Sequence, residues 1–179
     1  MILLKYYEIG KDCKILDIGT GGGFPGIPLK IFYSDNSFIL MDSINKKLEF
    51  IKEVIEELSL SDITVVHARA EDLGHDPSYR EKFDIVVSRA VANLSSLAEL
   101  SLPFVKENGL FISYKGSSAK DEIENAKTAL EKLGGELFQI NDYQLPFGED
   151  KRSLIFIKKR FHCPNIYPRK AGVPLRKPL

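Results

Sequence analysis

Short apolar runs and longer amphipathic stretches alternate along most of this 179-residue chain. The short runs have the length of strands, and the stretches between them carry apolar residues every three to four positions, as helices do. This alternation is typical of crossover units that build a parallel sheet. The predicted strands are residues 14–19, 37–42, 63–68, 83–88 and 109–115.

Two of the intervening stretches predict helices most clearly. In "NKKLEFIKEVIEELSL" one apolar stripe opposes a face of Lys and Glu. The stripe consists of Leu48, Ile51, Ile55 and Leu58. The stretch "SSAKDEIENAKTALEKLG" opens with serines suited to capping a helix and stops at Gly134 and Gly135, which suit its end.

The last two apolar runs, residues 136–145 and 153–159, have no helix-sized segment between them. We therefore expect them to form an antiparallel hairpin at the edge of the sheet. The sequence predicts an α/β fold with a seven-stranded, mostly parallel sheet. Neither an internal repeat nor an interdomain linker is visible, so residues 1–160 are expected to form one core and residues 161–179 a tail.

A glycine-rich turn, "DIGTGGGFPG", joins the first predicted strand to the first helix. Pro25 and Pro28 suit the first turn of that helix, where amide protons lack partners within the helix. In a parallel sheet such a turn lies at the carboxyl ends of the strands, where ligands bind, and missing Cβ atoms let a ligand approach the backbone. The alternative is a tight turn without a ligand.

The residues of this turn favour a cationic nucleoside over a dinucleotide. The glycines are Gly19, Gly21 and Gly23, and Phe24 stands where the dinucleotide fingerprint has its third glycine. Asp17, before the turn, would attract a cation and repel a pyrophosphate. S-adenosylmethionine, which carries a sulfonium and an ammonium group, fits both features.

Asp42 ends the second predicted strand, where an acid can accept hydrogen bonds from two ribose hydroxyls. Nicotinamide enzymes use an acid in the same way, so this residue does not separate the two cofactors. Asp42 is alternatively a cap for the helix that follows it.

The formal net charge of zero hides a basic end. The last 22 residues hold seven Lys or Arg and no acid, whereas the rest of the chain carries 18 basic and 25 acidic side chains. Such a tail is either a phosphate-binding arm or a solvated extension of an acidic body.

The two cysteines, Cys13 and Cys163, lie far apart in the sequence, so neither a zinc site nor a disulfide framework is expected. No apolar run approaches the roughly 20 residues that span a bilayer, and the first ten residues lack the pattern of a signal peptide. These features predict a cytoplasmic protein that acts away from membranes and holds no metal.

Several longer motifs together resemble the glucose-inhibited division protein B family. They are "DIGTGGGFPG", "MDSINKK", "HARAEDLG", "FDIVVSRAVANL", "LPFVKENGLFISYKG" and "YPRKAGVPLRKPL". The resemblance runs from about Lys11 to Leu179. It implies a class I, Rossmann-like methyltransferase fold and transfer of a methyl group from S-adenosylmethionine to N7 of a guanine in small-subunit ribosomal RNA. Family members carry a helical segment before the first strand, which these 179 residues do not include.

The resemblance also implies which residues contact the cofactor. These are Gly19, Phe24, Ala70, Glu71 and Arg89. Glu71 would accept from the adenine amino group, or else cap the short "EDL" turn. Arg89 ends an apolar strand, so we expect its charge to have an acidic or phosphate partner. The alternative to a role at the cofactor is that Arg89 forms a purely structural ion pair.

Methylation of guanine N7 needs no general base, because N7 has a lone pair and no proton to lose. Orientation of the reactants then supplies catalysis, and we assign no catalytic residue, although Arg89 is a candidate. His67 is expected to be packed or to cap, and His75 and His162 fall in a loop and in the tail.

The substrate would be small-subunit ribosomal RNA or the small ribosomal subunit, bound by a monomer. Basic residues would hold its backbone, and Tyr167 or Phe161 would stack on a base or anchor the tail by packing. The expected phosphate contacts are Lys115, Arg169, Lys170, Arg176 and Lys177, with Arg89 as a further candidate.

Two other functions remain open from the residues alone. A nicotinamide oxidoreductase would explain the fold and Asp42 but neither Asp17 nor Phe24. A noncatalytic RNA-binding or assembly factor that keeps the cofactor turn would explain the basic tail.

Overall fold

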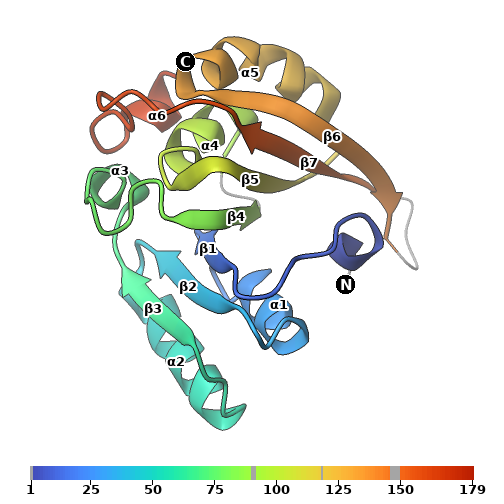
Figure 1. Cartoon of the computed structure of the whole chain (residues 1–179), viewed down its shortest axis with the longest axis vertical. Helices are drawn as coiled ribbons and strands as arrows, with labels where there is room; N and C mark the ends of the chain where they lie inside the picture. Colours follow the sequence, from blue (N-terminus) through green and yellow to red (C-terminus); the bar gives the residue numbers. More distant parts are fainter. Residues whose placement is uncertain (1, 90–91, 118, 146–149) are drawn as a thin grey trace.

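The chain folds around one seven-stranded sheet with helices on both faces (Figure 1). The structure is a computed structural model and describes residues 2–89, 92–117, 119–145 and 150–179. The strand order is β3-β2-β1-β4-β5-β7-β6. The strands are β1 (Lys14–Ile18), β2 (Ser37–Asp42), β3 (Ile63–His67), β4 (Phe83–Arg89), β5 (Val105–Lys115), β6 (Gly135–Gln144) and β7 (Lys151–Lys159).

The first five strands pair in parallel, whereas β7 runs antiparallel to both β5 and β6. The predicted parallel sheet and its terminal hairpin are therefore confirmed. The order reverses next to β1, which has β2 on one side and β4 on the other. In open α/β sheets, ligands bind at this kind of reversal, beyond the carboxyl ends of the strands.

The helices divide between the two faces according to where they stand in the chain. They are η1 (Ile2–Lys5), α1 (Gly26–Phe32), α2 (Asn45–Glu57), α3 (Ala70–Leu73), α4 (Leu94–Ser101), α5 (Ala119–Leu133) and α6 (Val173–Arg176). Buried residues of η1, α1 and α2 pack on one face, and those of α3, α4 and α5 pack on the other. This division is expected, because right-handed crossovers change face where the strand order reverses.

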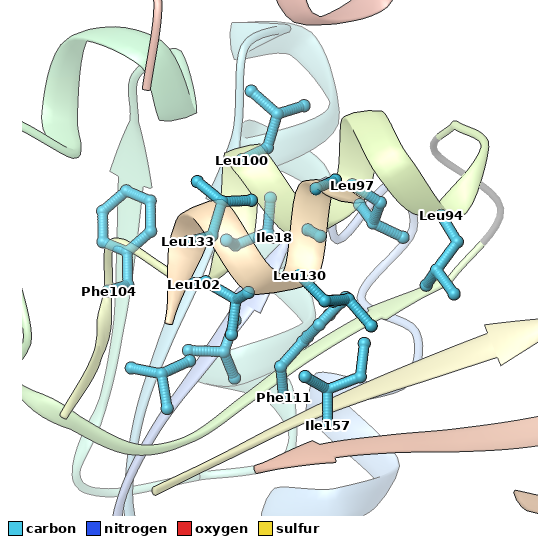
Figure 2. Packing of buried hydrophobic residues seen from close by; sticks show 14 of the residues in the cluster. Ile18, Leu94, Leu97, Leu100, Leu102, Phe104, Phe111, Leu130, Leu133 and Ile157 are labelled. Carbon is cyan, nitrogen blue, oxygen red and sulfur yellow. The ribbon is translucent and has the colours of Figure 1, made fainter. Parts of the chain in front are cut away.

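Each central strand is apolar on both of its faces, as a doubly covered parallel sheet requires. Along β4, Val86 faces α4 and α5, whereas Ile85 and Val87 face the other layer. Figure 2 shows the first layer, where Leu97 and Leu130 pack above Phe111. This core holds the carboxyl ends of β1, β4 and β5 in fixed register.

The two helix predictions differ from the structure only at helix ends. Leu48 and Ile51 are buried as predicted, but Leu58 is 48% exposed because α2 ends at Glu57 and the chain turns away. Gly134 ends α5 with a left-handed φ of 75°, as expected of a terminator. The capping role expected of Ser118 lies outside the described residues.

The basic tail lies against the body of the protein, beside α3 and α4 (Figure 1). The alternative of a solvated extension is therefore wrong. Cys13 and Cys163 are both free thiols. Among the described residues, no helix is long and apolar enough to cross a membrane, and no cluster of potential ligands could hold a metal ion.

Candidate cofactor site

The glycine-rich turn leaves β1 at Ile18 and enters α1 at Gly26. Gly19, Gly21 and Gly23 have φ values of 66°, 62° and 89°, a left-handed conformation that residues with a Cβ rarely adopt. The Gly19 and Thr20 amides donate to the Met41 carbonyl at 2.9 and 3.0 Å, which ties the turn to the end of β2. The three glycines are therefore required by the path of the backbone itself.

Asp17 lies beneath this turn and is fully buried. Its Oδ2 accepts from the Thr20 hydroxyl at 2.7 Å and from the Gly26 amide at 2.9 Å. Its Oδ1 has no hydrogen-bond partner among the described residues. The carboxyl group therefore fixes both ends of the turn. Because Asp17 is buried, its charge would attract a bound cation across the backbone of the turn and not by direct contact.

Burial raises the pKa of Asp17 to about 6, because a charged carboxylate loses its water there. The hydrogen bonds from Thr20 and Gly26 and the positive charge of Arg89 oppose this rise in pKa. Above pH 6 the turn thus encloses a negative charge without a neutralising ion pair in the described residues.

Asp42 ends β2, and both oxygens of its carboxylate accept hydrogen bonds from backbone amides. Its Oδ1 accepts from the Ile44 amide at 3.0 Å, next to the start of α2. Its Oδ2 accepts from the Gly21 amide at 3.0 Å and lies 3.6 Å from Lys47 Nζ. The same carboxylate therefore supports the start of the helix, holds the glycine turn, and lines a pocket.

This pocket is a cavity of about 320 Å³ at the carboxyl ends of β1 and β2. It brings together four residues that the sequence assigned to the cofactor: Gly19, Asp42, Ala70 and Glu71. Ile18, Met41, Leu100 and Leu175 add an apolar lining. A pocket that combines apolar side chains with carboxylates suits a nucleoside, whose base packs on apolar groups while its amino and hydroxyl groups donate hydrogen bonds.

Glu71 stands in the first turn of α3 and is buried. Its Oε1 accepts from the Gly172 amide at 2.8 Å, across 101 residues of sequence. It makes no capping hydrogen bond to α3, so the alternative of a helix cap is wrong. Sequence reasoning missed Gly172 and Leu175, because only folding brings the tail to this pocket.

Phe24 and Arg89 lie on the other side of the turn and contact each other. The Arg89 guanidinium lies 5.3 Å from the centre of the Phe24 ring, a cation–π contact. Within the described residues Arg89 forms no close ion pair, and the acid on which its charge acts is the buried Asp17. The side chain avoids the cost of an unpaired buried charge because it reaches solvent at the end of β4.

Phe24 and Arg89 line a second cavity of about 660 Å³, which we call the acceptor hollow. Its lining is Ile2, Lys5, Phe24, Pro25, Pro28, Arg89, Tyr114, Tyr143, Gln144 and Leu145. The turn thus separates two cavities, with Gly19 facing the cofactor pocket and Phe24 facing the hollow.

Tyr114 is the polar residue of the hollow that sequence reasoning missed. The residue is nine-tenths buried, and its hydroxyl finds no hydrogen-bond partner among the described residues. Burial raises the pKa of Tyr114 far above its ordinary value, so the hydroxyl keeps its proton. A buried hydroxyl without a partner costs free energy, which a hydrogen-bonding ligand would recover.

The structure contradicts the prediction that Lys115 is a phosphate contact. Lys115 is buried, and its Nζ forms a 2.7 Å ion pair with Glu122 and donates to the Ala92 carbonyl. A lysine committed in this way is a structural link between β5 and α5.

Arg169 is partly buried and forms an ion pair within the protein. Its Nη2 lies 2.6 Å from Oε2 of the fully buried Glu99, and its Nε donates to Glu99 Oε1 at 2.8 Å. Arg169 therefore anchors the tail to α4. Lys170, Arg176 and Lys177 are exposed, as a phosphate contact requires.

The remaining aromatic and histidine predictions have mixed outcomes. Tyr167 is buried and anchors the tail by packing, whereas Phe161 is 72% exposed and does not. His67 is exposed on β3 and hydrogen-bonds the Ser43 carbonyl at 3.1 Å. His75 contacts the Pro168 carbonyl and His162 contacts Glu81, so each histidine has a partner within the protein and none lines either cavity.

Comparison with known proteins agrees with this geometry. Residues 1–155 match the family model described as rRNA small subunit methyltransferase G. The chain is 52% identical over 176 residues to ribosomal RNA small subunit methyltransferase G of Desulforamulus reducens, covering 98% of this chain and 73% of that one. It is 53% identical over 169 residues to the protein of the same name from Acetivibrio thermocellus, covering 94% and 69%.

Among solved structures, the fold is similar to M. jannaschii TYW2 in complex with AdoMet. The TM-score is 0.67 at 16% identity, and the match covers 85% of this chain and 71% of that one. This likeness establishes the class I methyltransferase fold. Together with the family model and the sequence relatives, it shows that the chain belongs to the rRNA small subunit methyltransferase G family.

Proposed function

We propose that this protein transfers a methyl group from S-adenosylmethionine to N7 of a guanine in small-subunit ribosomal RNA. The observation that carries the proposal is the glycine turn, which has a nucleoside-sized pocket on one side and a separate hollow on the other. Membership of the methyltransferase G family supports the same reaction.

The residues of the pocket fit the cofactor. Asp42 would accept hydrogen bonds from the ribose hydroxyls, and Glu71 would accept one from the adenine amino group, beside Ala70. The bare backbone at Gly19, Gly21 and Gly23 would admit the ribose and methionine parts. Asp17, ionised above pH 6, would favour the positive sulfonium from beneath the turn. When bound, the cofactor supplies an electrophilic methyl group.

The acceptor guanine would enter the acceptor hollow. Phe24 is half exposed and lies beside Arg89, and the Tyr114 hydroxyl, which has no partner among the described residues, would donate to a base oxygen. Guanine N7 has a neighbouring acceptor, O6, on the same edge of the base. A donor that holds O6 would place N7 toward the turn, and orientation of this kind supplies the catalysis.

The exposed cations of the tail would hold the RNA backbone, with Lys170, Arg176 and Lys177 as phosphate contacts. In this proposal residues 1–160 supply the reaction core, residues 161–179 add RNA contacts, and the protein works in the cytoplasm as a monomer. Sedimentation of the purified chain with and without ribosomal RNA tests the monomer.

A labelled-methyl assay tests the activity. Small ribosomal subunits that lack the modification are incubated with the chain and labelled S-adenosylmethionine, and the labelled nucleotide is identified after digestion. We expect label in N7-methylguanine. Asp42→Ala should bind the cofactor more weakly and transfer less label.

Two outcomes would overturn the proposal in different ways. Cofactor binding without transfer to subunits or free RNA would favour a noncatalytic RNA-binding factor. Binding of a nicotinamide dinucleotide in preference to S-adenosylmethionine, measured by calorimetry, would favour the oxidoreductase.

A further inference from the structure

Residues Cys163–Lys177, here called the C-terminal segment, are tied to the body at their start by Arg80 and by Glu81, which accepts from the Cys163 amide at 2.8 Å. Arg80 Nη2 donates to the Cys163 carbonyl at 2.6 Å, and Nη1 donates to the Tyr167 carbonyl at 2.8 Å. Nη1 also donates to the Gly74 carbonyl at 2.7 Å, just beyond α3. The guanidinium therefore joins the segment to the end of the helix that carries Glu71.

A second attachment fixes the middle of the segment to α4. The Arg169 side chain and its backbone amide both donate to the buried Glu99 carboxylate, each at 2.8 Å to Oε1. Further along, the Ser96 hydroxyl donates to the Pro174 carbonyl at 2.6 Å. These hydrogen bonds are buried or charge-assisted, which are the stronger kinds.

The part of the segment that follows Arg169 reaches the cofactor pocket. Gly172 donates its amide to Glu71 Oε1, and the chain turns there with a left-handed φ of 78°. Leu175, three residues later in α6, lines the same pocket as Glu71 and Leu100. Leu175 is 50% exposed, so its other side meets solvent.

We propose that Gly172 and Leu175 are cofactor-site residues, so that the C-terminal segment is one wall of the pocket. Gly172 holds Glu71 Oε1, which orients the carboxylate and leaves Oε2 for a donor on the adenine ring. Leu175 covers the apolar face of that ring from the solvent side. This assignment rests on the proposed function, since it takes the nucleoside of S-adenosylmethionine as the occupant.

If the C-terminal segment forms one wall of the pocket and can detach from the body, cofactor binding and docking of the segment are coupled equilibria. The cofactor contacts Leu175 only while the segment is docked, so cofactor binding stabilises the docked state, and docking raises cofactor affinity by the same factor. This reciprocity separates a true wall from a segment that happens to lie nearby.

Calorimetric binding of S-adenosylmethionine to Leu175→Ala tests the wall. Leu58→Ala is a matched control, because Leu58 is also a half-exposed leucine at a helix end and lines neither cavity. We expect Leu175→Ala to bind about five- to tenfold more weakly at unchanged thermal stability, and Leu58→Ala to bind within twofold of the unaltered chain.

Limited trypsin digestion of the unaltered chain tests the coupling. Cleavage after Lys170 and Arg176 requires the segment to leave the body, whereas cleavage after Lys151 or Arg152 reports on the start of β7. We expect saturating cofactor to slow cleavage at the first pair of sites at least fivefold more than at the second pair.

Equal affinity of Leu175→Ala and the unaltered chain, or equal protection at both pairs of sites, would overturn this inference and leave the proposed function intact. Failure of the unaltered chain to bind S-adenosylmethionine would overturn both.

Discussion

The two cavities beside the glycine turn differ in how their polar groups are satisfied. In the cofactor pocket, Asp42 holds Gly21 and Ile44, and Glu71 holds Gly172, so its carboxylates are oriented before any ligand arrives. In the acceptor hollow, the buried Tyr114 hydroxyl has no hydrogen-bond partner among the described residues, and Arg89 makes a cation–π contact with Phe24. The carboxylates of the cofactor pocket are held in place by the protein itself, whereas the acceptor hollow keeps a hydrogen-bond donor for a ligand.

This difference fits the two partners of a transfer reaction. A small cofactor is bound tightly when the carboxylates that receive it are already held in place. An acceptor base on a large RNA is positioned mainly by its backbone, so the cavity that receives it needs only a few unsatisfied donors. Variants that change stability, cofactor binding or methyl transfer separately would distinguish the roles of the two cavities.

The largest expected effect concerns the charge beneath the turn. The folded-state pKa of Asp17 is raised from 3.8 to about 6, so the folded protein binds this proton more tightly than the unfolded chain. Its contribution to the free energy of unfolding is most favourable below pH 4 and falls as the pH rises from 4 to 6, by about 3 kcal/mol in all. Asp17→Asn, which keeps an oxygen for Thr20 and Gly26, should remove this fall.

Urea denaturation at a series of pH values measures this fall in the free energy of unfolding, with Asp35→Asn, at an exposed position, as control.

Asp17→Asn also tests whether the charge of Asp17 acts on the cofactor. In the unaltered chain the affinity for S-adenosylmethionine relative to S-adenosylhomocysteine, which lacks the sulfonium charge, should rise with pH through about 6. A ratio equally pH-dependent in Asp17→Asn would show that the charge beneath the turn does not act on the cofactor.

The next effect comes from adding one methyl group at the start of α1. A Cβ on Gly26 would lie 2.2 Å from Leu40 Cδ2 and 2.8 Å from Asp17 Oδ2, both in the buried interior. Gly26→Ala should lower the free energy of unfolding by about 2 kcal/mol, because the turn must shift to make room. Cofactor affinity should fall at least tenfold.

Gly22→Ala is the control, since a Cβ there meets nothing within 4 Å and its φ is not left-handed. Calorimetry and urea denaturation of both variants make the comparison. If Gly22→Ala weakened cofactor binding as much as Gly26→Ala, the turn would be sensitive to any side chain and not to packing against Asp17.

A smaller and opposite pair of effects is expected at Tyr114. Tyr114→Phe removes a buried hydroxyl that has no partner in the described part of the chain, so the free energy of unfolding should rise by about 1 kcal/mol. If that hydroxyl positions the acceptor base, kcat/KM for RNA should fall about tenfold while cofactor affinity stays unchanged.

Tyr7→Phe is a suitable control, because Tyr7 packs on Phe156 away from the hollow. Denaturation and steady-state methyl transfer are the measurements. A loss of stability in Tyr114→Phe would reveal a partner for the hydroxyl within the protein and would remove the contrast between the two cavities.

The sequence predicted the strands and the glycine turn well, because periodicity and backbone conformation are local properties. It failed where a side chain's role depends on a distant partner. Arg169 and Lys115 looked like free cations, but Glu99 lies 70 residues from the first and Glu122 neutralises the second after folding. Tyr114 looked like one more strand aromatic, since nothing local reveals that its hydroxyl lacks a partner.

The smallest predicted effects belong to the exposed cations of the C-terminal segment. Lys170→Ala and Lys177→Ala remove charges without ion pairs in the described part of the chain, so stability and cofactor affinity should not change. Each variant should weaken RNA binding about two- to threefold. Each should also reduce the slope of log K against log salt concentration by about one, as loss of a single phosphate contact does. Filter binding of ribosomal RNA at several salt concentrations measures both effects, with Lys52→Ala, at an exposed position on α2, as control.

Because contacts to phosphate position the RNA without touching the base, the kcat of Lys170→Ala and Lys177→Ala should stay unchanged, in contrast to that of Tyr114→Phe. A fall in kcat with unchanged RNA affinity would instead place these lysines in the reaction itself and would move the chemistry toward the cofactor side of the turn.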